Sequence, residues 1–316
     1  MMKITVLDSA TLGDDLDLSP LSAVGETEVY KNSAPDEVEG RISESDVVVI
    51  NKIKLNESNL SSAKKLKLIC IAATGYDNID VAYCKKAGIA VCNVVGYSTH
   101  SVAQITVATV LSLACHLPEH GETVKSGRYT ESGVANSLVP VYHELAGKTW
   151  GIVGFGNIGR QVGRVAEAFG CRVLANRRSG GDGCVSLEQL CRESDIITVH
   201  TPLSDSTRGL ISREMVALMK KDVIIANAAR GLVTDERAIA DAVKEGRIGA
   251  FGSDVFSVEP FGKDHPFYEI KDLPNVCLTP HMAWGAYEAR VRCLDEIVEN
   301  IKSFQNGETR SRVDLM

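Results

Sequence analysis

Short apolar runs recur along the 316-residue chain, separated by segments in which apolar residues follow helical spacing. Most runs are apolar throughout instead of alternating with polar residues, which is typical of parallel strands covered on both faces. Their alternation with helical segments predicts a doubly wound α/β fold. The predicted strands are Lys3–Asp8, Asp46–Asn51, Leu66–Ala73, Ala90–Val94, Thr149–Gly154, Cys171–Asn176, Asp195–His200, Asp222–Ala229, Gly249–Val255 and Val276–Pro280.

Two apolar stripes predict longer helices. One lies between Ile158 and Gly170, with Gly170 as a suitable C-terminal stop. The other begins at about Tyr287 and continues through Val298 to Phe304. We interpret both stripes as faces that pack against the core.

Length and charge narrow the class of protein. A chain of 316 residues favours two domains over a single core. The hydrophobic share of 44% and the charged share of 24% argue against disorder. The net charge of -7 argues against general binding to nucleic acid or to an anionic membrane surface.

The sequence also bears on the compartment. The segment Met1–Asp8 predicts a strand, and it lacks the long apolar region and small-residue cleavage site of a signal peptide. The longest near-apolar stretch, Ile105–Cys115, is too short to span a bilayer. The nine cysteines include no CxxC pair, which argues against a disulfide framework and against a zinc site. We therefore expect a cytoplasmic protein with free thiols and no metal site.

The segment Gly154–Gly159, with the sequence GFGNIG, follows one predicted strand and opens one predicted helix. The first glycine permits a tight turn, the second lets a pyrophosphate approach the backbone, and the third allows close packing of helix on strand. A glycine-rich turn can also serve packing alone, but the complete strand–turn–helix–strand context favours a dinucleotide site. The candidate cofactor-binding residues are Gly154, Gly156, Asn157, Ile158 and Gly159.

Arg177 and Arg178 stand just after the next strand, where an NAD enzyme usually has Asp or Glu for the adenosine ribose. Adjacent arginines would pair with a 2′-phosphate through charge-assisted hydrogen bonds. The pair therefore predicts a preference for NADP(H), with NAD(H) as a possible cofactor. The alternative is a solvated basic end of a loop.

Polar side chains mark several later strand ends, where doubly wound sheets bind their ligands. Thr201 and Pro202 follow one strand, Ala228 and Arg230 follow the next, and Asp254 and His281 come after the last two. We expect Thr201, Pro202 and Ala228 to contact the cofactor. An Arg, an Asp and a His at successive strand ends are hard to explain by stability alone, and Glu259 follows closely after Asp254.

The motifs together resemble those of the D-isomer-specific 2-hydroxyacid dehydrogenases, over essentially the whole chain. The resemblance implies interconversion of a small 2-oxo acid and its D-2-hydroxy acid with a nicotinamide cofactor. The matching segments are Gly154–Gly159, Asn227–Gly231, Asp254–Pro260 and Thr279–Trp284; Asn51–Lys52, Ala73–Asp80 and Gly96–Gln104 resemble the glycerate dehydrogenase (hydroxypyruvate and glyoxylate reductase) branch.

The resemblance implies a role for each candidate. Arg230 would bind the substrate carboxylate and polarise the 2-oxo oxygen, and His281 would be the general acid/base that Glu259 orients. Asp254 would hold the nicotinamide carboxamide. Taken singly, His281 and Glu259 are more typical of packing or loop positions; their placement beside Arg230 favours a site. Substrate-binding candidates are Lys52, Thr74, Gly75 and Arg230, and no catalytic role is expected for His100, His116, His120, His143, His200 or His265.

Three departures leave the substrate side chain open. The family usually has Glu at position 104 and Ser at position 286, where this chain has Gln104 and Ala286. Many members of the branch also carry a Trp in the stretch that corresponds to 136–139, which here reads NSLV. Because that stretch often reaches the partner subunit's active site in relatives, pocket shape and substrate size stay open.

The family's topology implies two α/β domains. Residues 1–98 with 286–316 would form a flavodoxin-like substrate domain, and residues 99–285 a Rossmann-type dinucleotide-binding domain. The resemblance also implies a homodimer, with residues 100–145 at the interface. Alternative functions are a phosphoglycerate dehydrogenase, a D-lactate-type dehydrogenase, and a dinucleotide-sensing protein like the C-terminal-binding-protein corepressors. Formate dehydrogenases resemble this fold but carry Gln at the position of Glu259, which disfavours them.

Overall fold

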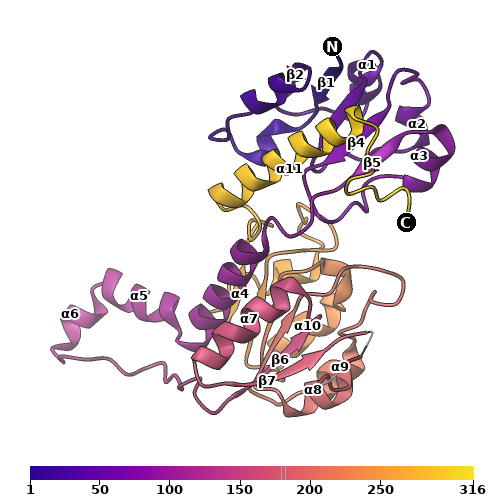
Figure 1. Cartoon of the computed structure of the whole chain (residues 1–316). Helices are drawn as coiled ribbons and strands as arrows, with labels where there is room; N and C mark the ends of the chain where they lie inside the picture. The colour runs from indigo at the N-terminus through magenta and orange to yellow at the C-terminus, as the bar shows by residue number, and fades with distance from the viewer. Residues whose placement is uncertain (179, 182) are drawn as a thin grey trace. The chain divides into compact units, whose positions relative to one another are not determined.

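The structure is a computed structural model that describes residues 1–178, 180–181 and 183–316. It divides into two compact units, each with its own parallel sheet (Figure 1). The first unit contains Met1–Ser98 and Trp284–Met316, and the second is the continuous segment Thr99–Ala283. Trp284, which the sequence analysis put in the other domain, packs edge-on against Tyr97 of the first unit with ring centroids 6.2 Å apart.

The first unit has five parallel strands in the order β2-β1-β3-β4-β5. This is the flavodoxin-like order, in which the strand sequence reverses beside the first strand. Its strands are β1 (Lys3–Val6), β2 (Glu26–Val29), β3 (Val47–Ile50), β4 (Leu68–Ile71) and β5 (Ala90–Cys92). Its helices are η1 (Ser9–Leu12), η2 (Ser19–Ala23), α1 (Val38–Ile42), α2 (Glu57–Leu60), α3 (Val81–Ala87) and α11 (Tyr287–Gln305).

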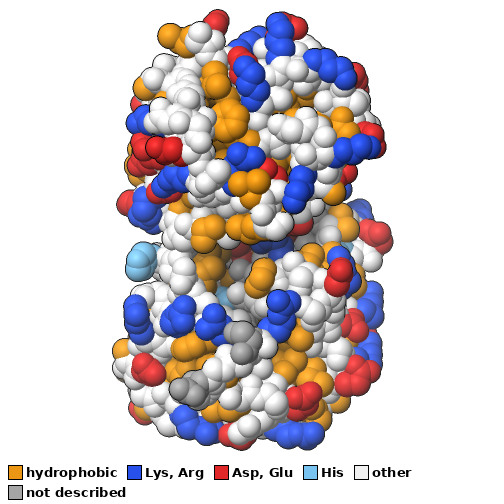
Figure 2. Space-filling model, turned by 45° about the vertical axis from the view of Figure 1, so that its right-hand side comes forward, with side chains coloured by type: hydrophobic (Ala, Val, Ile, Leu, Met, Phe, Trp, Pro, Cys, Tyr) orange, Lys and Arg blue, Asp and Glu red, His pale blue; other side chains and the backbone are white. Residues whose placement is uncertain are grey.

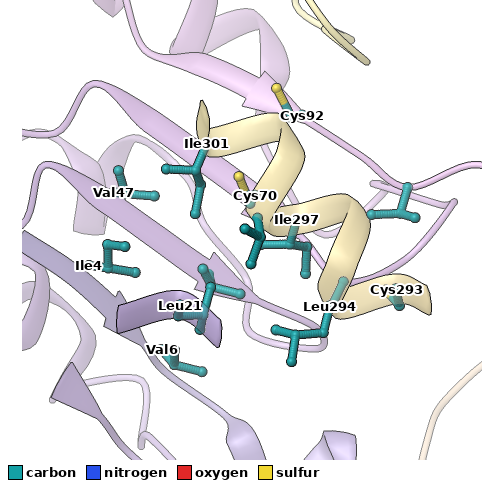
Figure 3. Close-up of a cluster of buried hydrophobic side chains, with 14 of the residues drawn as sticks. Ile4, Val6, Leu21, Val47, Cys70, Cys92, Cys293, Leu294, Ile297 and Ile301 are labelled. Carbon is teal, nitrogen blue, oxygen red and sulfur yellow. The ribbon is translucent and has the colours of Figure 1, made fainter. Parts of the chain in front are cut away.

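Both faces of this first sheet are buried. On one face, Leu294, Ile297 and Ile301 of α11 pack against side chains such as Ile4 and Cys70 (Figure 3). On the other face, α1, α2 and α3 cover a separate apolar cluster. Coverage on both sides explains why the central strands are apolar at every position.

The second unit has six parallel strands in the order β7-β6-β8-β9-β10-β11. An isolated parallel bridge pairs Ala175 of β7 with Cys184, which lies at the place of a further edge strand. Counting that bridge, the arrangement is Rossmann-like, and the strand order reverses between β6 and β8. The strands are β6 (Thr149–Val153), β7 (Arg172–Asn176), β8 (Ile196–Val199), β9 (Ile224–Asn227), β10 (Ala250–Ser253) and β11 (Val276–Leu278).

Helices cover both faces of the second sheet as well. On one face α4 and α7 lie side by side, and α8, α9 and α10 contribute to the core on the other face (Figure 1). The bounds are α4 (Thr99–Ala114), α5 (Leu117–Lys125), α6 (Arg128–Ser132), α7 (Asn157–Ala168), α8 (Leu187–Glu193), α9 (Arg213–Leu218), η3 (Gly231–Val233), α10 (Glu236–Lys244) and η4 (Pro266–Glu269).

All ten predicted strands are present, each inside its predicted range, and the α/β class of both parts is confirmed. The sequence analysis missed β2, whose residues Glu26–Val29 are half-buried or exposed and mostly polar. β2 is an edge strand that pairs only with β1, so it needs no apolar run. Both predicted helices are also confirmed, as α7 and α11.

Helices α5 and α6 project from the end of α4, and an extended segment returns from them to β6 (Figure 1). We call residues 115–148 the arm. The arm carries several exposed apolar side chains, among them Leu138, Val139 and Val141. Within the described residues, no single helix is long and apolar enough to cross a membrane, and only the pair α4 and α5, bent by 63°, passes that test together.

Candidate active site

The glycine-rich turn between β6 and α7 forms an open cradle. Gly154 has φ +93°, and a Cβ there would lie 2.6 Å from the Thr201 nitrogen. A Cβ on Gly159 would lie 2.4 Å from the Gly154 oxygen, so the helix sits directly on the turn. A Cβ on Gly156, by contrast, would meet nothing within 4 Å.

This cradle fits a dinucleotide pyrophosphate. Gly156 is the N-cap of α7, and as a glycine it has no side chain to accept a hydrogen bond from the first turn. The N–H groups at the start of the helix, where Asn157 and Ile158 stand, therefore remain oriented outward along the helix axis. The N-terminus of a helix attracts phosphate through these N–H groups and through the helix dipole. The turn also lies between β6 and β8, where the strand order reverses.

Basic side chains follow β7. Arg177 and Arg178 are exposed, and Arg178 donates from Nη1 to the Ser206 hydroxyl at 2.9 Å. Lys and Arg side chains gather in a row on one face of the second unit (Figure 2). The Arg178–Ser206 contact ties the end of β7 to the loop after β8.

That loop begins with His200, Thr201 and Pro202. Thr201 is half-buried and Pro202 is exposed, and the Pro202 carbonyl accepts a hydrogen bond from the Thr207 hydroxyl at 2.7 Å. The two ring nitrogens of His200 are buried and have no hydrogen-bond partner among the described residues. Burial lowers the pKa of His200 from 6.5 to about 3, so its imidazole is neutral at physiological pH.

Arg230 stands after β9, at the N-cap of η3. The Asn227 side chain donates to the Arg230 carbonyl at 3.0 Å and accepts from the Ala229 N–H at 3.0 Å, which fixes the backbone just after the strand. Arg230 itself donates from Nη1 to the Ala229 carbonyl at 2.9 Å. Ala228 is half-buried in the same turn.

The structure brings His281 and Glu259 together. His281 Nδ1 lies 2.6 Å from Glu259 Oε2, and both side chains are partly buried, at 20% and 29% exposed. Glu259 Oε1 accepts the Phe256 N–H at 2.9 Å, so both carboxylate oxygens are engaged. With Nδ1 on the carboxylate, Nε2 is the ring nitrogen that can exchange a proton with a substrate.

His281 has φ +51°, an unusual conformation for a non-glycine residue. Asp254, which is buried, holds the loop around it: Oδ1 accepts the Thr279 hydroxyl at 2.6 Å and the Met282 N–H at 2.9 Å, and Oδ2 accepts the Ala283 N–H at 2.9 Å. Asp254 was expected to contact the cofactor, which stays a prediction; its contacts here show that it shapes the backbone that carries His281.

Three substrate-binding candidates lie in the first unit, after two neighbouring strands. Lys52 follows β3, and its backbone N–H donates to Asp8 at 2.6 Å. Thr74 follows β4 and donates to the Val94 carbonyl at 2.7 Å, with Gly75 next to it. Because parallel strands end at one edge of the sheet, these loops share that edge.

Sequence reasoning missed the groups that hold these loops. The buried Asp8 accepts N–H groups from Asn51, Lys52 and Ile53 and so fixes the Lys52 turn; burial, the largest effect, raises its pKa, while these hydrogen bonds lower it. The sequence also showed no sign of a buried pair in the second unit, in which His265 Nε2 lies 2.9 Å from Glu236 Oε2. No local motif marks such contacts, because the residues that make them are distant in the sequence.

The sequence model of the D-isomer specific 2-hydroxyacid dehydrogenase NAD binding domain matches residues 107–283, more than half of the chain. The chain belongs to the D-isomer specific 2-hydroxyacid dehydrogenase family. This 2-hydroxyacid dehydrogenase is therefore a nicotinamide-dependent oxidoreductase that interconverts small 2-oxo acids and D-2-hydroxy acids.

Relatives cover the whole dehydrogenase. The hydroxypyruvate reductase of Blautia hydrogenotrophica is 36% identical, with 97% of this chain and 98% of the relative covered. The glycerate dehydrogenase of Methylorubrum extorquens is 34% identical, with 99% of both chains covered. Among solved structures, the NADPH-dependent glyoxylate/hydroxypyruvate reductase of Sinorhizobium meliloti, in complex with NADP and malonate, aligns with a TM-score of 0.84 at 26% identity, covering 99% of this chain and 96% of that one.

Proposed function

We propose that this dehydrogenase reduces hydroxypyruvate or glyoxylate to the corresponding 2-hydroxy acid, with NADPH preferred over NADH. The observation that carries the proposal is the His281–Glu259 pair, joined at 2.6 Å at the ends of the last two strands of a dinucleotide-binding sheet. Relatives named for these substrates span almost the whole chain.

In the proposed reaction His281 supplies the proton. A bound nicotinamide would supply a hydride to the carbonyl carbon, and the protonated imidazole would give its Nε2 proton to the carbonyl oxygen. Glu259 holds Nδ1, which fixes the ring orientation and stabilises the charged form of the imidazole until the proton leaves. In the reverse direction, the neutral imidazole takes the hydroxyl proton at Nε2.

Arg230 supplies the anion site. A guanidinium pairs with an α-oxo carboxylate through parallel hydrogen bonds and draws electron density from the adjacent carbonyl. The Asn227 hydrogen bonds fix its backbone directly after β9, so the charge is oriented before substrate binds. Lys52, Thr74 and Gly75 of the first unit stay predicted substrate-binding residues.

The cofactor would lie on the cradle of Gly154, Gly156 and Gly159. We assign its pyrophosphate to the N-terminus of α7, and the loop residues Thr201, Pro202 and Ala228 to the nicotinamide half. Arg177 and Arg178 would pair with a 2′-phosphate. The Arg178–Ser206 hydrogen bond supports this assignment, because it holds one guanidinium at the end of β7 before any ligand binds.

We further propose a cytoplasmic homodimer joined by the arm. Leu138 is 71% exposed and Val139 is 74% exposed, which is unusual for adjacent apolar side chains without a partner. A second copy of the chain would cover them. Leu138→Asp should then shift the sedimentation coefficient from dimer to monomer, while Leu315→Asp, at another exposed apolar position, should not. A wild-type monomer would contradict the assignment.

The reaction is tested by initial rates with hydroxypyruvate, glyoxylate, pyruvate and 3-phosphohydroxypyruvate, each with NADPH and with NADH. His281→Gln should lower kcat by roughly 10²–10⁴-fold and leave NADPH binding unchanged. A control at an exposed carboxylate of α8, outside the arm, is Glu188→Gln, which should leave kcat unchanged. Full activity of His281→Gln would contradict the acid/base role, and fastest turnover of the phosphorylated acid would point to a phosphoglycerate dehydrogenase instead.

The cofactor preference has its own test. Replacing Arg177 and Arg178 together by Ala should raise the KM for NADPH roughly 10- to 100-fold, because charge-assisted hydrogen bonds are lost, and leave the KM for NADH unchanged. Arg164→Ala, an exposed arginine of α7, is the control. An equal effect on both cofactors would contradict a 2′-phosphate site.

A further inference from the structure

A buried network lies behind the loop that carries Glu259. Its centre is Glu236, in the first turn of α10, with a side chain 8% exposed. Glu236 Oε1 accepts the Ser257 N–H at 2.8 Å, and Oε2 accepts the Ser257 hydroxyl at 2.5 Å. His265 Nε2 lies 2.9 Å from the same Oε2. The three residues come from three separate segments of the second unit.

The hydrogen bonds define where the protons are. His265 Nδ1 accepts the Phe267 N–H at 3.1 Å, so the imidazole carries its proton on Nε2 and donates it to Glu236. Glu236 is then a carboxylate with three donors, which is how a buried charge is satisfied. The rings of Phe256, Phe261 and Phe267 surround His265, with centroids 6.1, 4.9 and 5.2 Å away.

The network connects directly to the active-site carboxylate. The Phe256–Ser257 peptide, held by Glu236, lies so close to Gly231 that a Cβ there would be 2.0 Å from the Phe256 carbonyl carbon. The N–H of Phe256 itself donates to Glu259 Oε1, and Glu259 Oε2 bonds to His281 Nδ1. The two successive peptides that flank Phe256 therefore link these groups: the one after it contacts Gly231 and the Glu236 carboxylate, and the one before it donates to Glu259.

We infer that Glu236, Ser257 and His265 are positioning residues that hold Glu259, and through it His281, in the geometry for proton transfer. The inference rests on the proposed function for the roles of Glu259 and His281. A buried carboxylate is weak evidence for stability by itself, because apolar residues of similar volume often stabilise as well. Here the Glu236 carboxylate accepts hydrogen bonds from Ser257, in the loop between Asp254 and Glu259. The network therefore defines the position of the Glu259–His281 pair.

The test removes the side-chain donors to Glu236 one at a time, and restores one of them. Ser257→Ala removes the hydroxyl, and Ser257→Thr restores it. His265→Asn keeps an acceptor for the Phe267 N–H but loses the donor to Glu236. The matched control is Glu269→Gln, on η4, whose exposed carboxylate pairs with Arg237 and Lys244 of α10 outside the network.

Five quantities are measured for each full-length variant: kcat and KM with hydroxypyruvate, the Kd for NADPH by fluorescence titration, the melting temperature, and the imidazole ¹⁵N signals. His281→Gln identifies the His281 signals. Ser257→Ala and His265→Asn should lower kcat roughly 10- to 100-fold, because small displacements of a proton donor are costly. The Kd for NADPH should stay unchanged, and His281 should lose its single Nδ1–H form. Ser257→Thr should recover most of kcat.

Two outcomes would overturn the inference. One is wild-type kcat and unchanged His281 signals in Ser257→Ala. The other is a parallel loss of kcat, NADPH affinity and melting temperature that Ser257→Thr does not reverse, which would indicate a structural role alone. If the wild-type chain turned over none of the 2-oxo acids, the proposed function would fail, while the His281 signals would still decide whether the network positions the pair.

Discussion

The buried His200 makes a measurable prediction for stability at acidic pH. Within the part of the chain that the structure describes, its ring nitrogens have no hydrogen-bond partner, and burial lowers its pKa from 6.5 to about 3. The unfolded chain therefore takes up a proton below pH 6.5, whereas the folded chain stays neutral at this site until about pH 3. Protonation favours the unfolded state throughout that window, so the folded state loses stability as the pH falls.

The magnitude follows from the two pKa values. Each pH unit between them is worth about 1.4 kcal/mol, so the whole window amounts to roughly 5 kcal/mol. At pH 5, 1.5 units below the unfolded value, the loss is about 2 kcal/mol. His200→Leu removes the titrating group and should remove this part of the pH dependence. When the pH falls from 7.5 to 5, the free energy of unfolding of His200→Leu should rise by about 2 kcal/mol relative to that of the wild type.

The assay is urea unfolding of the second unit. Trp150 is buried in that unit, and its indole N–H donates to Thr198 on β8, the strand that ends at His200. In a Trp284→Phe background, Trp150 is the one remaining tryptophan of the two in the chain. A difference between wild type and His200→Leu that does not change with pH would refute the reasoning.

Three further predictions concern other buried contacts. Gly154→Ala should weaken NADPH binding and destabilise the second unit by about 1–3 kcal/mol in urea unfolding, since φ is +93° and a Cβ would lie 2.6 Å from a main-chain nitrogen. Asp254→Asn turns an amide toward main-chain N–H donors, so unfolding free energy should fall by about 1–3 kcal/mol and kcat should fall with it. Burial raises the pKa of Asp314, but hydrogen bonds from Arg312 and the Val91 N–H outweigh it and leave the pKa below 3.8. Its contribution is present above pH 3.8 and is lost at lower pH, so Asp314→Asn should flatten stability curves in that acidic range.

Much of the fold could be predicted because burial on both faces leaves a strong signal. Central strands such as Val47–Ile50 are apolar at each position, and no turn residue interrupts them. The edge strand Glu26–Val29 carries no such signal, since one neighbour and an exposed side allow polar residues. The strand orders were implied only by the family resemblance, as the flavodoxin-like and Rossmann-type arrangements, because apolar runs alone do not say which strands are neighbours.

The candidate site was predictable where it coincides with strand ends. Arg230 and His281 each follow a strand, and parallel strands bring their carboxyl ends to one edge. The supporting residues were not predictable. Glu236 and His265 are polar residues in ordinary surface-like sequence, and only the fold buries them against each other.

The first unit is assembled from two distant stretches of chain, and this has a consequence for synthesis. Ile4 in β1 and Ile301 in α11 share one apolar cluster (Figure 3). During translation the first 98 residues emerge with one sheet face uncovered, while residues 99–283 form a continuous unit that can fold as soon as it is complete. The unit that begins the chain therefore becomes stable last, and a chaperone that shields apolar surface would be needed most in that interval.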